Sequence, residues 1–173
     1  MVIPRCYIGL ASAIIFQMGI WLPGSVPQAA AENLNLKMFS HVTKMEMASI
    51  ADAEGHTITL TLRKGVTVFE NGEWAWVKAT LIRDLVKGTG TADNYTTWTF
   101  LDGSTVIVRT KSKIEGTPQG VAKFTGDIIH GTGRFQGVKG TGAWAARLLT
   151  PDKGEPEGKT FVEGTLVYTL PNK

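Results

Sequence analysis

Apolar and polar side chains alternate along most of this chain. The segment His56–Leu62 alternates strictly, with Ile58, Leu60 and Leu62 at one parity and threonines at the other. A period of two is typical of a β-strand with one buried face. We therefore expect the isoleucine and the leucines to face the core, and the threonines to face outward.

The segment Thr105–Lys113 repeats this pattern. Arg109, Lys111 and Lys113 share one face, which we expect to be the outer one, and the inner face then carries Val106, Val108, Thr110 and Ser112. Further segments rich in Val, Ile, Thr, Phe and Trp are predicted as strands: Leu34–Ala48, Val66–Glu70, Glu73–Val86, Asn94–Leu101, Val121–Ile129, Ala143–Leu149 and Thr160–Leu170.

Turn signals separate these strands, and no window shows a sustained helical period. Asn71-Gly72 and Asp102-Gly103 are dipeptides favoured in tight hairpins. About eight strands joined by hairpins predict an all-β fold with one antiparallel domain, either a closed barrel or a sandwich. A barrel is favoured because closure removes exposed edges. A lipocalin-like barrel is the main alternative, but residues 33–48 lack the Gly-x-Trp that it would require.

Residues 1–31 resemble a secretory signal peptide. Arg5 precedes an apolar run from Cys6 to Leu22, and small residues end in Ala29-Ala30-Ala31 before Glu32. This order predicts cleavage after Ala31 and a secreted or periplasmic product, with no membrane association after cleavage. The alternative is a retained membrane anchor. Residues 32–173 then form the barrel domain, which lacks a cysteine because Cys6 is the only one.

Composition argues against several function classes. The formal net charge is +3, too small to indicate nucleic acid as a partner. His41, His56 and His130 are isolated in sequence, so we expect no metal site, and there is no Gly-x-Ser-x-Gly elbow of a serine hydrolase. We expect no cofactor.

The segment from Gly131 to Gly142 contains five glycines. It does not fit a dinucleotide-binding loop, since no helix is predicted after it, nor a Walker loop, since Lys139 is followed by Gly140. The favoured interpretation is structural: the glycines turn the chain and Phe135 plugs one end of the barrel.

Two C-terminal stretches resemble a known superfamily. Gly131-Thr132-Gly133-Arg134-Phe135-Gln136-Gly137-Val138-Lys139-Gly140 resembles the G-G-T-G-x-F-x-G-A-x-G segment of dirigent proteins, and Phe161–Tyr168 is similar to their F-x-G-x-L-x-Y ending. Allene oxide cyclases share the same barrel. The resemblance implies an eight-stranded antiparallel barrel, often trimeric, that binds a hydrophobic small molecule in its mouth or lumen without metal or cofactor.

Strand parity supplies the candidate site residues. In Glu73–Val86 the more apolar face is expected to point inward and carries Arg83, a candidate catalytic residue that could orient a carboxylate or polarise a carbonyl. The alternative is that Arg83 lies at the rim of the barrel and reaches solvent. Trp74 and Trp76 are then outside, at a subunit contact. Glu46 is a second catalytic candidate, on the same strand face as Val42 and Ala48, but it does not align with the early-strand glutamate of allene oxide cyclases.

Asn94, Trp98 and Phe100 are the candidate ligand-binding residues. They share one face of the segment Asn94–Leu101, and an amide beside two aromatic rings suits a small-molecule pocket. An ordinary packed core is the alternative. The sequence thus predicts an exported barrel that binds a hydrophobic small molecule. The alternatives are a cofactor-independent cyclase, isomerase or coupling-guide protein, and a purely structural barrel that assembles into homo-oligomers.

Overall fold

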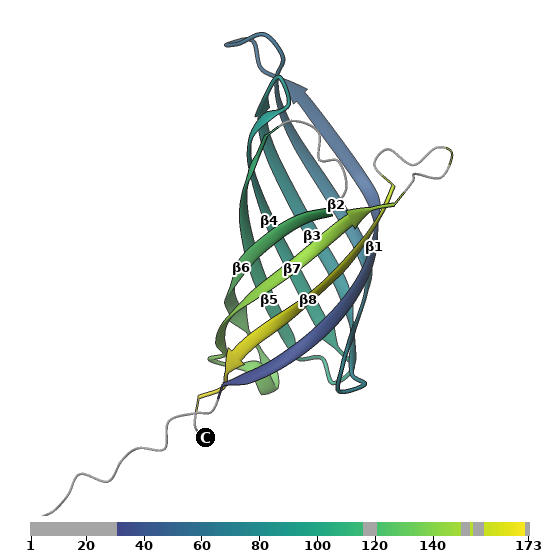
Figure 1. The fold of residues 1–173 in the computed structure, drawn as a ribbon, viewed down its shortest axis with the longest axis vertical. Helices are drawn as coiled ribbons and strands as arrows, with labels where there is room; N and C mark the ends of the chain where they lie inside the picture. Colours follow the sequence, from purple (N-terminus) through teal and green to yellow (C-terminus); the bar gives the residue numbers. More distant parts are fainter. Residues whose placement is uncertain (1–30, 116–120, 150–152, 154–157, 172–173) are drawn as a thin grey trace, which may run out of the picture.

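Eight strands form one closed antiparallel barrel in the computed structural model, which describes residues 31–115, 121–149, 153 and 158–171 (Figure 1). The strands follow one another in sequence order, and β8 pairs with β1 to close the barrel. The predicted closed β-barrel is confirmed. The expected signal peptide lies outside the described residues, apart from Ala31. The strands are β1 (Glu32–Ser49), β2 (His56–Phe69), β3 (Trp74–Val86), β4 (Thr89–Phe100), β5 (Thr105–Ile114), β6 (Val121–Gly131), β7 (Lys139–Leu148) and β8 (Lys159–Thr169).

Glycines with positive φ turn three of the hairpins. The dipeptides Asn71-Gly72 and Asp102-Gly103 behave as predicted, with glycine φ angles of +84° and +80°. The turn between β3 and β4 uses Lys87-Gly88, at φ +50° and +81°. Two successive positive φ angles match the twist of flanking strands in a tight hairpin.

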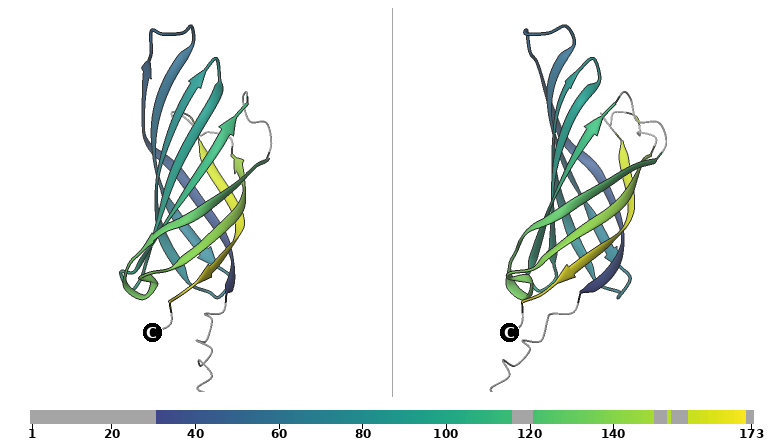
Figure 2. Two further views of the ribbon diagram at one scale, coloured as in Figure 1. Left: turned by 90° about the vertical axis from the view of Figure 1, so that its left-hand side faces the viewer. Right: turned by 60° about the vertical axis from the view of Figure 1, so that its left-hand side comes forward.

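The strands differ in length, and the barrel is therefore taller on one side. β1 and β2 have 18 and 14 residues, whereas β7 has 10. The β1–β2 and β3–β4 hairpins consequently stand above the ends of β7 and β8 (Figure 2). We call this end the upper end, as in Figure 1, and the opposite end, with the β2–β3 and β4–β5 turns, the lower end.

The lower half of the barrel is filled by an aromatic core. Phe135 lies 8% exposed, with its ring centroid 4.7 Å from that of Phe100 and 6.4 Å from that of Tyr168. Phe69 stacks on Phe100 at 5.4 Å and meets Trp98 edge-on at 5.8 Å. The free volume left between these side chains is about 10 Å³. This packing holds the lower strand ends together.

The glycine-rich segment forms the lower closure, as predicted. Its short 3-10 helix η1 (Gly133–Phe135) inserts Phe135 into the core, and Gly133 and Gly137 adopt φ +60° and +76°. The Arg134 guanidinium lies over the rings of Phe100 and Phe135, at 4.9 and 4.7 Å from the centroids. Arg134 Nη1 also contacts Glu73 Oε1 at 2.6 Å, which ties η1 to the β2–β3 turn.

Among the described residues, no helix is long and apolar enough to span a membrane.

The faces of β2 are the reverse of the prediction. Thr59 and Thr61 are buried inside the barrel, at 7% and 0% exposed, whereas Ile58 points outward at 39% exposed. The two predicted segments His56–Leu62 and Val66–Glu70 are one continuous strand. Because Phe69 must enter the lower core, every odd-numbered residue of this strand follows it inward.

Candidate functional site

Three cross-strand rows line the inner side of β1–β4 above the aromatic core. The first row joins Met47, Thr59, Arg83 and Ala92, the second Met45, Thr61, Leu81 and Asn94, and the third Val42, Arg63, Ala79 and Thr96. Directly paired residues of antiparallel strands point to the same face. We call these twelve residues the upper inner face.

A β-bulge in β1 decides which side chains reach this face. The register shifts between Val42 and Lys44, and the hydroxyl of the intervening Thr43 donates to the Leu62 carbonyl oxygen at 3.2 Å. Beyond the bulge the parity of β1 is inverted. Met45 and Met47 are therefore on the inner side, opposite buried threonines of β2.

Glu46, a predicted catalytic candidate, lies on the outer side of the barrel. It pairs with Leu60 in register, and its Oε1 contacts Lys44 Nζ at 2.6 Å, with 56% of its side chain exposed. The expectation that Glu46 shares a face with Val42 is wrong, because the bulge lies between them. The structure does not bring Glu46 together with the second candidate, Arg83, which is on the inner side.

Arg83 is half-buried on the inner side of the barrel, where it pairs with Thr59, and Arg63 lies on the same side. Arg83 Nη2 donates to Thr61 Oγ1 at 3.3 Å, and Arg63 Nη1 donates to Thr160 Oγ1 at 2.5 Å. Burial lowers the pKa of both guanidinium groups, and the positive charge of Arg63 lowers the pKa of Arg83 further. Two cationic groups therefore share the upper interior.

The predicted ligand-binding residues are divided between two regions. Asn94 belongs to the upper inner face, where its Nδ2 donates to Thr96 Oγ1 at 3.1 Å. Trp98 and Phe100 are 3% and 6% exposed in the aromatic core. A ligand-binding role for the three residues stays a prediction, and the geometry leaves room for it only at Asn94.

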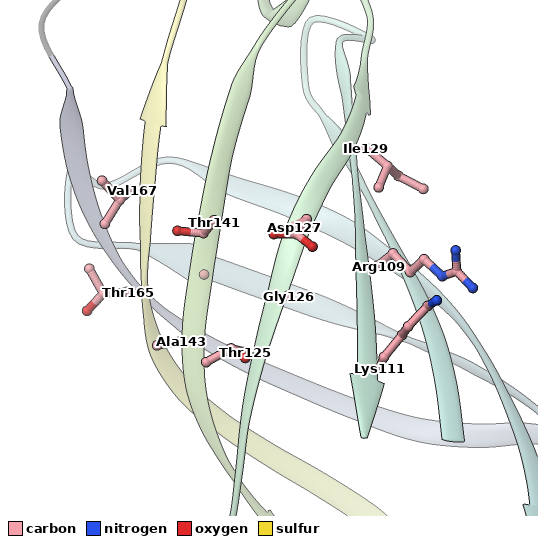
Figure 3. A pocket seen from close by; sticks show the side chains of 11 residues that line it. Arg109, Lys111, Thr125, Gly126, Asp127, Ile129, Thr141, Ala143, Thr165 and Val167 are labelled. Atoms are coloured by element: carbon pink, nitrogen blue, oxygen red, sulfur yellow. The ribbon is translucent and has the colours of Figure 1, made fainter. Parts of the chain in front are cut away.

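A groove of about 710 Å³ lies on the outer side of β5–β8. Figure 3 shows Arg109 and Lys111 at one side of it and Thr165 and Val167 at the other. Arg109 is held by Asp93, with Nε 2.9 Å from Oδ1, and this pair lowers the pKa of Asp93. The groove is open to solvent and shallow, so it is a less enclosed place for a small molecule than the barrel interior.

A histidine between two carboxylates lies at the upper end. His56 Nδ1 is 2.5 Å from Asp52 Oδ1, and His56 Nε2 is 2.9 Å from Asp84 Oδ1. Both hydrogen bonds raise the pKa of His56, and the bond with Asp52 has the larger effect. The contacts connect the β1–β2 loop to β3. Within the described parts of the chain, no group of three or more His, Cys, Asp or Glu side chains is arranged to hold a metal ion.

Sequence reasoning missed Met45, Met47 and Arg63. The methionines were missed because the prediction continued the same inward–outward alternation along the whole of β1. The bulge that reverses this alternation cannot be recognised from a single sequence. Arg63 was missed because it falls in the gap between two predicted strands. The one available signal in the sequence was Gly65. In the structure, a Cβ at this position would lie 2.0 Å from the Phe39 carbonyl oxygen. This glycine therefore allows β1 and β2 to approach closely, and it does not end the strand.

Comparison with known proteins finds similar chains among solved structures. No protein-family model and no curated protein matches the chain. Among solved structures, the chain is similar to the pterocarpan synthase dirigent protein GePTS1, at 15% identity over 83% of this chain and 93% of that one, with a TM-score of 0.48. It is also similar to the pterocarpan synthase dirigent protein PsPTS1, at 16% identity over 84% of this chain and 99% of that one, with a TM-score of 0.47. At such identities the likeness concerns the fold alone.

Proposed function

We propose that this protein is a small-molecule-binding barrel that holds a hydrophobic ligand on the upper inner face. The proposal rests on one observation: two apolar side chains on the concave side of the barrel are exposed to solvent. Met45 is 37% exposed and Met47 is 66% exposed. Neighbouring apolar side chains that remain accessible to solvent often mark a place where a ligand or partner binds.

The contrast between the two halves of the interior supports this location. The lower half retains about 10 Å³ of free volume, no more than about one water molecule needs. A ligand therefore has to lie above Trp98, where the inner side changes to threonine, alanine, methionine and leucine. Short side chains at Ala79 and Ala92 leave the strand backbone close to whatever lies in front of it.

The chemistry of the upper inner face suits a mainly apolar ligand with a few polar groups. Met45, Met47 and Leu81 supply apolar contact, and methionine adapts its shape to different partners. Asn94 supplies a polar group on the same surface. Binding sites for small molecules combine these two elements in this way.

We also propose that the ligand is met outside the cytoplasm. The basic start, apolar run and alanines before Glu32 support export.

Titration with N-phenyl-1-naphthylamine, a neutral probe whose fluorescence rises in apolar surroundings, tests ligand binding. We expect saturable binding by the purified protein, and a Kd raised about fivefold by the double substitution Met45→Gln and Met47→Gln, which retains volume but removes apolar contact. Ile129→Gln, in the outer groove, is the control and should leave the Kd unchanged. Absence of saturable binding, or weakening by the Ile129 change in place of the methionine changes, would contradict the proposal.

A further inference from the structure

The barrel wall is open between β5 and β6 over part of its height. From the lower end, these strands pair with each other only as far as Thr110 and Gly126. Beyond this point residues 111–114 pair with β4 and residues 121–125 pair with β7, but the two stretches do not pair with each other. Figure 3 shows the two strands diverging here. We call residues 111–114 and 121–125 the open seam.

Each side of the open seam is the edge of a sheet. The register of residues 111–114 on β4, and that of residues 121–125 on β7, runs without a shift, so both stretches are regular extended backbone. An edge strand presents backbone N–H and C=O groups that another strand can use. Peptides are recognised in this way when they add a strand to a sheet: main-chain hydrogen bonds give the affinity, and alternate side chains give the specificity.

Every charged side chain on the open seam is a lysine. Lys111 and Lys113 of β5 and Lys123 of β6 are exposed at outward positions. Lys111 is directly opposite Asp93, but both oxygens of that carboxylate already accept hydrogen bonds from Arg109. Among the described residues, no carboxylate forms an ion pair with any of the three ammonium groups. A partner with carboxylates would supply this charge.

The same lysines oppose pairing of the open seam with a second copy of the chain. Two identical edges placed side by side would bring like charges together, and lysine on an edge strand is a common means of preventing such pairing. An acidic partner is therefore favoured over a copy of the protein itself.

The inward side of the open seam is apolar or small. Ile114 of β5 and Phe124 of β6 are half-buried at inward positions, and the remaining inward positions carry Ser112 and Ala122. Phe124 pairs with Trp144, which packs against the core. Successive side chains of a strand point to opposite faces. An added strand would therefore place every second side chain beside the lysines and the others beside these inward groups.

We propose that the open seam binds an extended peptide in which acidic and apolar residues alternate. The peptide adds as a strand to the edge of β5, which carries two of the three lysines, and has β6 on its other side. The outer groove starts at this place, since Lys111, Thr125 and Gly126 line it, and it leaves room for the acidic side chains. This interaction is separate from the upper inner face and does not depend on a ligand there.

Fluorescence anisotropy with fluorescein-labelled synthetic peptides tests the proposal. We expect saturable binding of the peptide Glu-Val-Glu-Val-Glu-Val-Glu, and a Kd at least about tenfold higher when lysine replaces each glutamate. Two further peptides carry a methyl group on the backbone nitrogen of every valine or of every glutamate. At least one of them should bind about tenfold more weakly, because methylation removes N–H donors and retains the charges.

Variants of the protein locate the binding. The double substitution Lys111→Gln and Lys113→Gln should raise the Kd of the glutamate peptide about fivefold. The matched control is Lys64→Gln with Lys78→Gln, which removes two exposed lysines that face each other on fully paired strands, and it should leave the Kd unchanged. Bound peptide should also slow hydrogen exchange at the amides of residues 111–114.

Each opposite result overturns the proposal. Absence of saturable binding, equal affinity for the glutamate and lysine peptides, or weakening by the control substitutions in place of the seam substitutions would exclude recognition by these lysines. Full affinity of both methylated peptides, without slower exchange at residues 111–114, would mean charge attraction with no added strand. If the protein alone shows exchange at residues 111–114 that slows as its concentration rises, the edge pairs with a second copy instead.

Discussion

Met45 lies directly opposite Thr61 on the inner side of the barrel, one residue out of phase with the first half of its own strand. The bulge at Thr43 produces this relationship by adding a residue to β1 that β2 does not match. As a result, an exposed apolar side chain faces inward and a charged one, Glu46, faces outward. The composition of the upper inner face thus depends on one irregularity in one strand.

The aromatic closure of the lower end should carry a large share of the stability. Phe135→Ala removes a ring that contacts Phe100 and Tyr168, and we expect it to lower the free energy of unfolding by about 3 kcal/mol. Gln136→Ala, at the exposed neighbouring position, is the control and should change it by less than about 0.5 kcal/mol. Denaturant unfolding measures both. Equal effects of the two substitutions would mean that Phe135 is not a plug.

The contacts of His56 predict a pH dependence of stability. Asp52 and Asp84 raise the pKa of His56 in the folded state, so its stabilising contribution is complete below the pKa of the unfolded state, near 6.5. That contribution is lost as the pH rises through the raised folded pKa. We expect His56→Gln to lower Tm more at pH 5.5 than at pH 8.5.

His130→Gln, on the outer side of β6, is the control for this effect. Its Tm difference from the wild type should be similar at both pH values. A larger effect of His56→Gln at pH 8.5 than at pH 5.5 would contradict the assigned contacts.

Trp76 is the most direct test of self-assembly. It is 57% exposed, meets Trp74 edge-on with centroids 5.3 Å apart, and pairs with Val66 on the outer side of the barrel. Assembly into a homo-oligomer is one of the alternatives that the sequence leaves open. If the two tryptophans form the subunit contact, Trp76→Glu should lower the mass measured by light scattering to that of one chain, because a charged side chain would replace an apolar ring at that contact. Leu101→Glu, on an exposed turn, should leave the mass unchanged. A wild-type protein that is monomeric at all concentrations would exclude this role.

Much of the barrel could be predicted where strand parity is unbroken. In β3, Ala75 and Val77 are buried and Trp76 is exposed, as the alternation predicted. In β5, Val106 and Val108 are buried with Arg109 on the outer side, again as predicted. These strands follow a simple period, and the more apolar face of each enters the core.

The inward-facing residues of β1 and β2 could not be predicted, because their orientation depends on how neighbouring strands pair. Thr61 is inside because Phe69, eight positions later on the same strand, has to be inside. The sequence analysis divided this strand near Gly65 and therefore did not connect the orientations of the two residues. Met47 is inside because of a bulge that leaves no mark in the sequence. Exposure of Met45 and Met47 on the inner side depends on the unequal heights of the strands (Figure 2), which are set by pairing over the whole barrel.

Labelling of two adjacent positions in β1 tests the central claim most directly. The only cysteine in the sequence is Cys6, so in a Cys6→Ser background Met47→Cys and Glu46→Cys each place one thiol, on the inner and the outer side. With saturating N-phenyl-1-naphthylamine, we predict that maleimide labelling slows several-fold at Met47→Cys and stays unchanged at Glu46→Cys. Protection at Glu46→Cys, or equal rates with and without the probe at both positions, would show that the ligand does not occupy the upper inner face.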